Sequence, residues 1–316
     1  MKNENTDYSR KNLRPNLFLK GMAMGAADVV PGVSGGTIAF ITGIYEELVN
    51  ALNCVDLTAL KMLFSGQVLA AWLHINGNFL AVLFAGILAS IFSMANLVGW
   101  LLDEHPIIVW AYFFGLILAS VVMLARKVDL RNLRYLIALL IGAGVAFEIT
   151  QMTAVSINPT GWVITACGAL AICAMILPGI SGSFILLLLG MYEPILSAVK
   201  GFEVRTICLF ALGCAIGLIA FSRLLSWLLS RYHQLTLAVL TGFILGSLNK
   251  MWPWKYNLEE DGVVHELNTL PANYQVINQA DPQLQAVFIA LVVGVATIFF
   301  INRVGNAGKL VILGSY

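Results

Sequence analysis

Six continuous apolar stretches of about 20 residues each set the strongest limit on how this chain can fold. A helix needs about that length to cross a hydrocarbon core about 30 Å thick. Only 11% of the residues are charged and 59% are apolar, a balance that soluble domains do not show. We therefore predict an all-α polytopic membrane protein. The expected spans are residues 79–102, 106–125, 135–152, 206–229, 234–250 and 283–301.

Charge and cysteine content argue against several other classes. The formal net charge of +1 provides no basic surface for neutralising nucleic-acid phosphates, so we expect no nucleic-acid partner. The five cysteines include no Cys-x-x-Cys pair and mostly lie within apolar stretches, which is typical of small buried apolar residues. We expect membrane lipids around the protein, no cofactor and no bound metal. The sequence does not indicate whether the protein forms oligomers.

Two further apolar stretches, 17–52 and 161–199, are interrupted in the middle. The interruptions read Pro-Gly-Val-Ser-Gly-Gly from Pro31 and Pro-Gly-Ile-Ser-Gly from Pro178. Such residues break helices, and each half is short for a span. Irregular backbone at membrane depth must be buried in protein or line a wet cavity, because lipid cannot satisfy its N–H and C=O groups. We predict two re-entrant helical hairpins inside the bundle.

The distribution of basic residues predicts which segments face the cytoplasm, the side that they favour. The basic tail 1–16 should be cytoplasmic. If 17–52 enters and returns on one side, the basic loop 126–134 is also cytoplasmic, the acidic stretch 251–282 is external, and the tail 302–316 ends inside. A single crossing by 17–52 would place the basic loop outside. Charge placement therefore favours the hairpin.

The sequence also repeats itself. The segment that begins at Pro31 aligns with the segment that begins at Pro178, and two later blocks match in the same order. We expect a first repeat over 17–152 and a second over 161–301, each with one hairpin and three spans. Three crossings per repeat turn the second upside down relative to the first, as in many secondary transporters, whose sites lie at the repeat interface. An insertion at 53–75 could be a surface helix.

Each hairpin would open a short helix inside the bundle, with free N–H groups and the positive end of the helix dipole facing the cavity. Glycines let an anion approach the backbone, and hydroxyls add donors. Alternatively, these residues only permit a tight turn and close packing. We favour a shared phosphate site, in which Val at Gly35 or Gly182 would block the anion and leave the fold intact. Its residues are Ser34, Gly35, Gly36, Thr37, Ser181, Gly182 and Ser183.

Few ionisable residues lie at membrane depth, where each is costly. Arg223 falls within an expected span, and its equivalent in the first repeat is the neutral Asn96. Its guanidinium could bind the phosphate headgroup through two hydrogen bonds, or it could extend to the cytoplasmic interface. Four acidic residues are candidates for ion coupling or gating, although helix capping or interfacial anchoring would also explain them. They are Asp28, Glu46, Glu148 and Glu193.

The paired loops, each followed by Gly-x-Tyr-Glu, resemble those of the domain-of-unknown-function 368 family of bacterial membrane proteins, and the resemblance covers nearly the whole chain. That family is associated with polyprenyl-phosphate translocation. The resemblance therefore implies a flippase that returns undecaprenyl phosphate across the cytoplasmic (inner) membrane for reuse in cell-envelope synthesis, with a polyprenyl phosphate lipid as partner. The residues themselves indicate only an inverted-repeat transporter with two loops suited to an anion.

Two other classes fit parts of this pattern. One polyprenyl-diphosphate phosphatase family also has inverted re-entrant repeats, but its loop reads Pro-Gly-x-Ser-Arg-Ser, and here Gly35 and Gly36 replace the Arg-Ser pair. All four histidines lie outside the loops, and neither loop contains a general acid or a phosphate-binding arginine. A transporter of a small anion also fits. We expect a transporter rather than an enzyme, with no catalytic residues.

Overall fold

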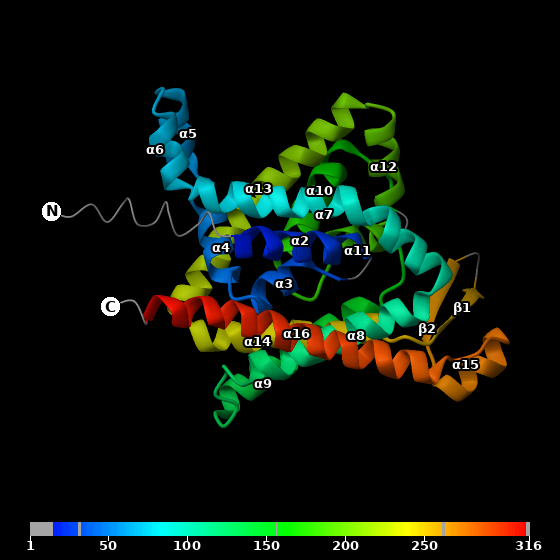
Figure 1. Ribbon diagram of the computed structural model, residues 1–316. Coiled ribbons are helices and arrows are strands. Elements are labelled where there is room, and N and C mark those ends of the chain that lie inside the picture. The colour runs from blue at the N-terminus through cyan, green and yellow to red at the C-terminus, as the bar shows by residue number, and fades with distance from the viewer. Residues whose placement is uncertain (1–14, 31–32, 156, 261–262, 314–316) are drawn as a thin grey trace. The chain divides into compact units, whose positions relative to one another are not determined.

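The computed structural model describes residues 15–30, 33–155, 157–260 and 263–313, and most of them are helical (Figure 1). Within these residues, four helices are long and apolar enough to cross a membrane. They are α7 (Gly77–Glu104), α8 (Pro106–Ala125), α9 (Leu133–Gln151) and α13 (Val204–Arg231). Their large apolar side chains are often exposed, as lipid-facing ones are; Phe92 on α7 is 83% exposed. The chain is therefore a helical multi-pass membrane protein.

The other two expected spans also lie in helices, but neither reaches the length of a candidate span within the residues searched. The helix α14 (His233–Ser247) has 15 residues and continues into the 3-10 helix η1 (Leu248–Met251). The helix α16 (Leu284–Leu313) is a candidate only as a shorter apolar segment, over 284–300. Length and composition thus support four of the six spans.

The helices form two compact units. Unit 1 contains the chain up to Ala95 and residues 154–236, and unit 2 contains residues 96–153 and the chain from Leu237 onward. Neither unit coincides with an expected repeat, because each takes equivalent segments from both halves of the sequence. Unit 1 holds both interrupted stretches, and unit 2 holds the later spans of each half. The repeat boundaries and their inverted relation remain predictions.

In unit 1, both interrupted stretches are broken where the sequence predicts, and each consists of three helices rather than two halves. The short middle helices have seven residues each and the following helices nine each, so the two stretches match element by element. In each, the first helix packs against the short one across the loop, as expected for a re-entrant hairpin. The first set is α2 (Pro15–Val29), α3 (Gly35–Ile41) and α4 (Tyr45–Asn53); the second is α10 (Gly161–Ile176), α11 (Gly182–Leu188) and α12 (Tyr192–Lys200).

Close helix crossings hold each hairpin against a long helix of unit 1. On α13, a Cβ atom at Gly213 would overlap the carbonyl oxygen of Thr165 on α10. On α7, a Cβ atom at Gly86 would overlap the carbonyl oxygen of Phe18 on α2. Small residues let membrane helices approach this closely, and van der Waals contact then stabilises the pair. A glycine on the long helix therefore permits the close packing of each hairpin.

The insertion at 53–75 forms two short helices, α5 (Leu57–Phe64) and α6 (Val68–His74), rather than one surface helix. They pack against each other and run across the direction of α7 (Figure 1). Ala59 and Ala71 are buried, whereas Phe64 is 83% exposed and Leu69 is 71% exposed. This helical pair therefore presents an apolar surface outward.

Unit 2 contains a small β-sheet that the all-α prediction missed. The strands β1 (Lys255–Glu260) and β2 (Val263–Asn268) pair antiparallel with Lys255 opposite Asn268, and α15 (Pro271–Asn278) follows. The sequence did hold a signal, since Asp261-Gly262 stands between two strand-like runs. The membrane-like composition of the rest of the chain masked it.

The sheet is anchored to the first turn of α8. The indole N–H of Trp254 donates to the carbonyl oxygen of Pro282 (2.9 Å), and Trp254 packs in a core with Ile107 of α8. The ammonium of Lys255 lies 4.1 Å from the ring centroid of Trp110 and 3.2 Å from a carboxylate oxygen of Glu266. Burial lowers the pKa of Lys255 to about 8, although Glu266 opposes this shift.

Candidate functional site

The backbone amides of the first hairpin loop already donate hydrogen bonds to nearby groups of the protein. Ser34 is the N-cap of α3, and its hydroxyl oxygen accepts from the amide of Gly36 (3.1 Å). The amide of Gly35 donates to the carboxylate of Asp28 (2.7 Å), and the amide of Thr37 donates to the carbonyl of Ser34 (2.9 Å). The three amides expected to hold an anion are thus already bonded within the protein. Asp28 takes the capping role that was the alternative to ion coupling.

The two hairpins are in direct contact through side chains of the first one. The hydroxyl oxygen of Thr37 accepts from the amide of Gly179 (2.8 Å), and the hydroxyl of Tyr45 donates to the carbonyl of Ile176 (3.1 Å). Ser34 reaches the same segment through the carbonyl of Leu177 (3.3 Å). These three side chains are at most 2% exposed. The loops are therefore interlocked, as a site shared by both hairpins requires.

The second loop differs because its donors are less occupied. The hydroxyls of Ser181 and Ser183 lie 2.7 Å apart and bond to each other, and Ser181 does not cap α11 with its side chain. Within the described residues, no hydrogen-bond partner is recorded for the amide of Gly182, although this residue is buried. Buried amides are nearly always paired. Of the two hairpin loops, the second is therefore the one with hydrogen-bond donors available for a ligand.

The loop glycines serve close packing. A Cβ atom at Gly35 would lie 2.6 Å from a carboxylate oxygen of Asp28, and one at Gly182 would lie 2.6 Å from the carbonyl oxygen of Ala171 on α10. Protein atoms therefore occupy the space that a side chain at either position would need. Because the obstructing atom at Gly182 belongs to the backbone, the expectation that valine would leave the fold intact is wrong there; at Gly35, where a side chain obstructs, it stays a prediction.

The remaining carboxylates do not gather at the loops. Glu46 lies 3.0 Å from Nε2 of His233, and both side chains are exposed. Glu193 is exposed on α12, and Glu148 is exposed on α9 in unit 2. Neither forms an ion pair with the described residues. No group of three or more His, Cys, Asp or Glu side chains in the described part of the chain could hold a metal ion.

Arg223 lines an open groove of about 470 Å³ in unit 1, and none of the hairpin-loop residues lines this groove. The groove also contains the carboxylate of Asp56 and the imidazole of His74. Oδ1 of Asp56 lies 3.3 Å from Nε2 of His74. The pKa of Asp56 is lowered first by the amide of Ala59 and further by His74. Sequence reasoning missed this pair because the insertion has no equivalent in the second repeat. The lining residues are Asn53, Cys54, Asp56, His74, Arg223, Ser226, Trp227 and Ser230.

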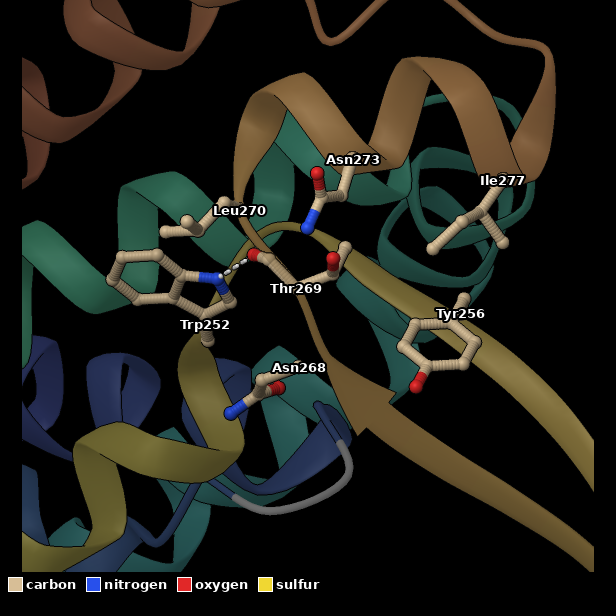
Figure 2. A pocket seen from close by; sticks show the side chains of 7 residues that line it. All are labelled: Trp252, Tyr256, Asn268, Thr269, Leu270, Asn273 and Ile277. Carbon is tan, nitrogen blue, oxygen red and sulfur yellow. Dashed lines mark hydrogen bonds between the residues drawn. The ribbon is translucent and has the colours of Figure 1, made fainter.

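A second open pocket, of about 450 Å³, lies in unit 2 between β2, α15 and the start of β1 (Figure 2). Its lining carries no charged side chain, and the indole N–H of Trp252 is bonded to the carbonyl of Thr269 (2.7 Å). A phosphate would lose its hydration there without a compensating charge. This pocket is therefore a poor candidate for a phosphate site. Its lining residues are Trp252, Tyr256, Asn268, Thr269, Leu270, Asn273 and Ile277.

Comparison with known proteins finds similarity along most of the chain. Residues 24–266, which include both hairpin loops and Arg223, match the VCA0040-like family, described as undecaprenyl phosphate translocase-like. A polyprenyl-phosphate transporter of Vibrio cholerae serotype O1 is 45% identical over 293 residues, which are 90% of this chain and 95% of that protein. A polyprenyl-phosphate transporter of Staphylococcus aureus is 31% identical over 258 residues, 75% of this chain and 85% of that protein. No solved structure matches the chain.

Proposed function

This chain belongs to the VCA0040-like family of undecaprenyl phosphate translocase-like proteins, and we propose that it moves a polyprenyl phosphate across the bacterial cytoplasmic membrane. The observation that carries the proposal is the 45% identity over 90% of the chain to a polyprenyl-phosphate transporter. The helical spans and the two interlocked hairpins suit this activity, because a lipid headgroup needs a protein-lined route through the bilayer. Undecaprenyl phosphate is the lipid that the family description names.

We place the phosphate at the interlocked loops. The second loop supplies the amide of Gly182 and one hydroxyl donor of the bonded pair Ser181 and Ser183. Ser34, Gly35, Gly36 and Thr37 would join only when their present bonds open, since Asp28 and Ser34 now hold those amides. The Asp28 carboxylate is itself an anion at the start of α3, so it and a phosphate would compete for the same donors. Asp28 is therefore our candidate for coupling or gating.

The geometry favours a transporter over a phosphatase. A phosphatase needs a nucleophile or activated water beside a group that transfers protons. The described side chains that reach the two loops are hydroxyls and the carboxylate of Asp28, which is bonded to the amide of Gly35. The histidines nearest in the sequence, His74 and His233, are paired with Asp56 and Glu46. The chain thus offers donors for holding a phosphate, with no arrangement for cleaving one within the described residues.

Contacts within each unit agree with the proposed sidedness. Glu46 contacts His233, and Asn50 contacts Ser226 (2.9 Å); charge placement puts all four on the cytoplasmic side. In unit 2, the amide of Asn249 donates to the hydroxyl oxygen of Thr150 (2.8 Å), and both lie at the external ends of their helices. None of these contacts joins segments assigned to opposite faces. We infer inverted repeats with residues 1–16 in the cytoplasm.

Cysteine labelling tests this orientation. In a variant without the five native cysteines, Arg131→Cys should react with a membrane-impermeant maleimide only from the cytoplasmic side, because it lies in the basic loop 126–134. Asn257→Cys on β1 should react only from outside. Phe92→Cys, which faces lipid, is a control that should react from neither side. Labelling of Arg131→Cys from outside in intact cells would contradict the hairpin topology and the inverted repeats.

Reconstitution of the purified protein into liposomes tests the transport activity. We expect a labelled polyprenyl phosphate to move between leaflets and become accessible to a membrane-impermeant quencher, whereas protein-free liposomes should retain it. Release of inorganic phosphate from polyprenyl diphosphate, without lipid movement, would favour a phosphatase. Uptake of soluble phosphate, again without lipid movement, would favour a small-anion transporter.

A further inference from the structure

The groove around Arg223 contains a cation whose charge is not neutralised locally. Arg223 is exposed on α13, about two turns before the helix ends, and forms no ion pair or hydrogen bond with the described residues. The one carboxylate in the groove, Asp56, is already bonded to the amide of Ala59 (2.8 Å) and to His74 (3.3 Å). The guanidinium therefore keeps its planar set of donors for another anion.

Other donors in the groove also lack partners. Within the described residues, no hydrogen bond is recorded for the indole N–H of Trp227 or for the side-chain amide of Asn53. The hydroxyls of Ser226 and Ser230 donate to Asn50 and to the carbonyl of Trp227, so their oxygens keep only acceptor capacity. One cation and two neutral donors thus line a space large enough for a phosphate group and the first carbons of its substituent.

The surroundings of the groove are apolar. Leu224, which follows Arg223 on α13, is 49% exposed, and Trp227, one turn later, is 54% exposed. Asp56 is the N-cap of α5 and His74 is the last residue of α6, so the exposed apolar surface of α5 and α6 begins at the groove itself. A helical pair of this kind, running across a transmembrane helix, suits the membrane interface. A ligand in this groove therefore meets donors on one side and lipid-facing surface on the other.

We propose that this groove is a headgroup site for a lipid phosphomonoester, separate from the hairpin loops and located at the cytoplasmic interface. Arg223 binds the phosphate with support from Trp227 and Asn53, and the lipid chain leaves along the exposed surface of α13 and α5–α6. The site rests on the proposed function only for the identity of the lipid. In the first repeat, Asn96 and Trp100 occupy the places equivalent to Arg223 and Trp227. The cation, and with it the headgroup site, therefore belongs to one leaflet.

Protection of Cys54 from alkylation tests the site directly, because this half-buried thiol lines the groove. The probe is farnesyl phosphate, with the full-length protein in detergent. We expect it to slow alkylation of Cys54 and to leave the rate at Cys208, an exposed cysteine near the other end of α13, unchanged. Arg223→Gln should raise the concentration needed for protection roughly tenfold, as expected when one charge-assisted pair is lost. Arg205→Gln, in the first turn of α13, is the matched control and should behave as the wild type.

The remaining comparisons separate the possible ligands. Farnesol should not protect Cys54, because it has no anion, and inorganic phosphate should protect only at much higher concentration. Equal protection by inorganic phosphate would assign the groove to a free anion and overturn the lipid assignment. Unchanged protection in a folded Arg223→Gln variant would overturn the site. Lipid movement in liposomes is measured independently, so wild-type transport without Arg223-dependent protection refutes the groove alone, and protection without transport refutes the proposed function alone.

Discussion

Replacing Gly182 with alanine is expected to destabilise the protein by about 1–3 kcal/mol, and valine is expected to do so by more. The added Cβ atom would lie 2.6 Å from the carbonyl oxygen of Ala171, a backbone atom of α10 that cannot move without shifting the helix. The start of α11 would be displaced from α10, and the backbone of the second loop would change conformation. Lower thermal midpoints in detergent, together with lost lipid movement in liposomes, would show this.

Gly144 provides the matched control for this substitution. It lies within α9, and a Cβ atom there would meet nothing within 4 Å. Gly144→Ala should therefore keep or slightly raise the thermal midpoint, since alanine favours the helix over glycine by up to about 1 kcal/mol. If Gly182→Ala matched Gly144→Ala in stability, the close packing of α11 on α10 would be refuted.

Thr37→Val is expected to cost about 1–3 kcal/mol, because it leaves the buried amide of Gly179 without its acceptor while keeping the side-chain shape. Thr37→Ser retains the hydroxyl and should cost less, through the loss of one methyl group. Since this bond links the two hairpins, the valine variant should also slow lipid movement more than the serine variant does. Thermal midpoints and liposome transport rates of the two purified variants provide the comparison.

A valine variant that is at least as stable and as active as the serine variant would show that the Thr37–Gly179 bond does not couple the hairpins. Gly179 adopts a φ of +94°, a conformation that glycine accepts readily. Its amide direction is therefore set by the turn. Another acceptor cannot easily replace the hydroxyl oxygen of Thr37, which is why a measurable loss is expected.

Local patterns in the sequence predicted the membrane class, the broken hairpins and their likeness to each other. Long apolar runs leave a chain few options besides membrane helices, and Pro-Gly-x-Ser-Gly interrupts a helix wherever it occurs. The equal lengths of α3 and α11, and of α4 and α12, follow from the repeated segments that begin at Pro31 and Pro178. The shared phosphate site at these loops remains a prediction.

The partners of each polar group could not be predicted in this way, because they depend on contacts between segments far apart in the chain. Sequence pattern marks Gly35 and Gly36 as donors, but their amides are bonded to Asp28 and Ser34 once α2 and α3 fold together. The sequence also identifies Arg223 as a cation that is costly at membrane depth. Its position beside the insertion, which has no counterpart in the second repeat, depends on the packing of α13 against α4. Periodicity reports which faces are apolar; which donors remain for a ligand depends on packing.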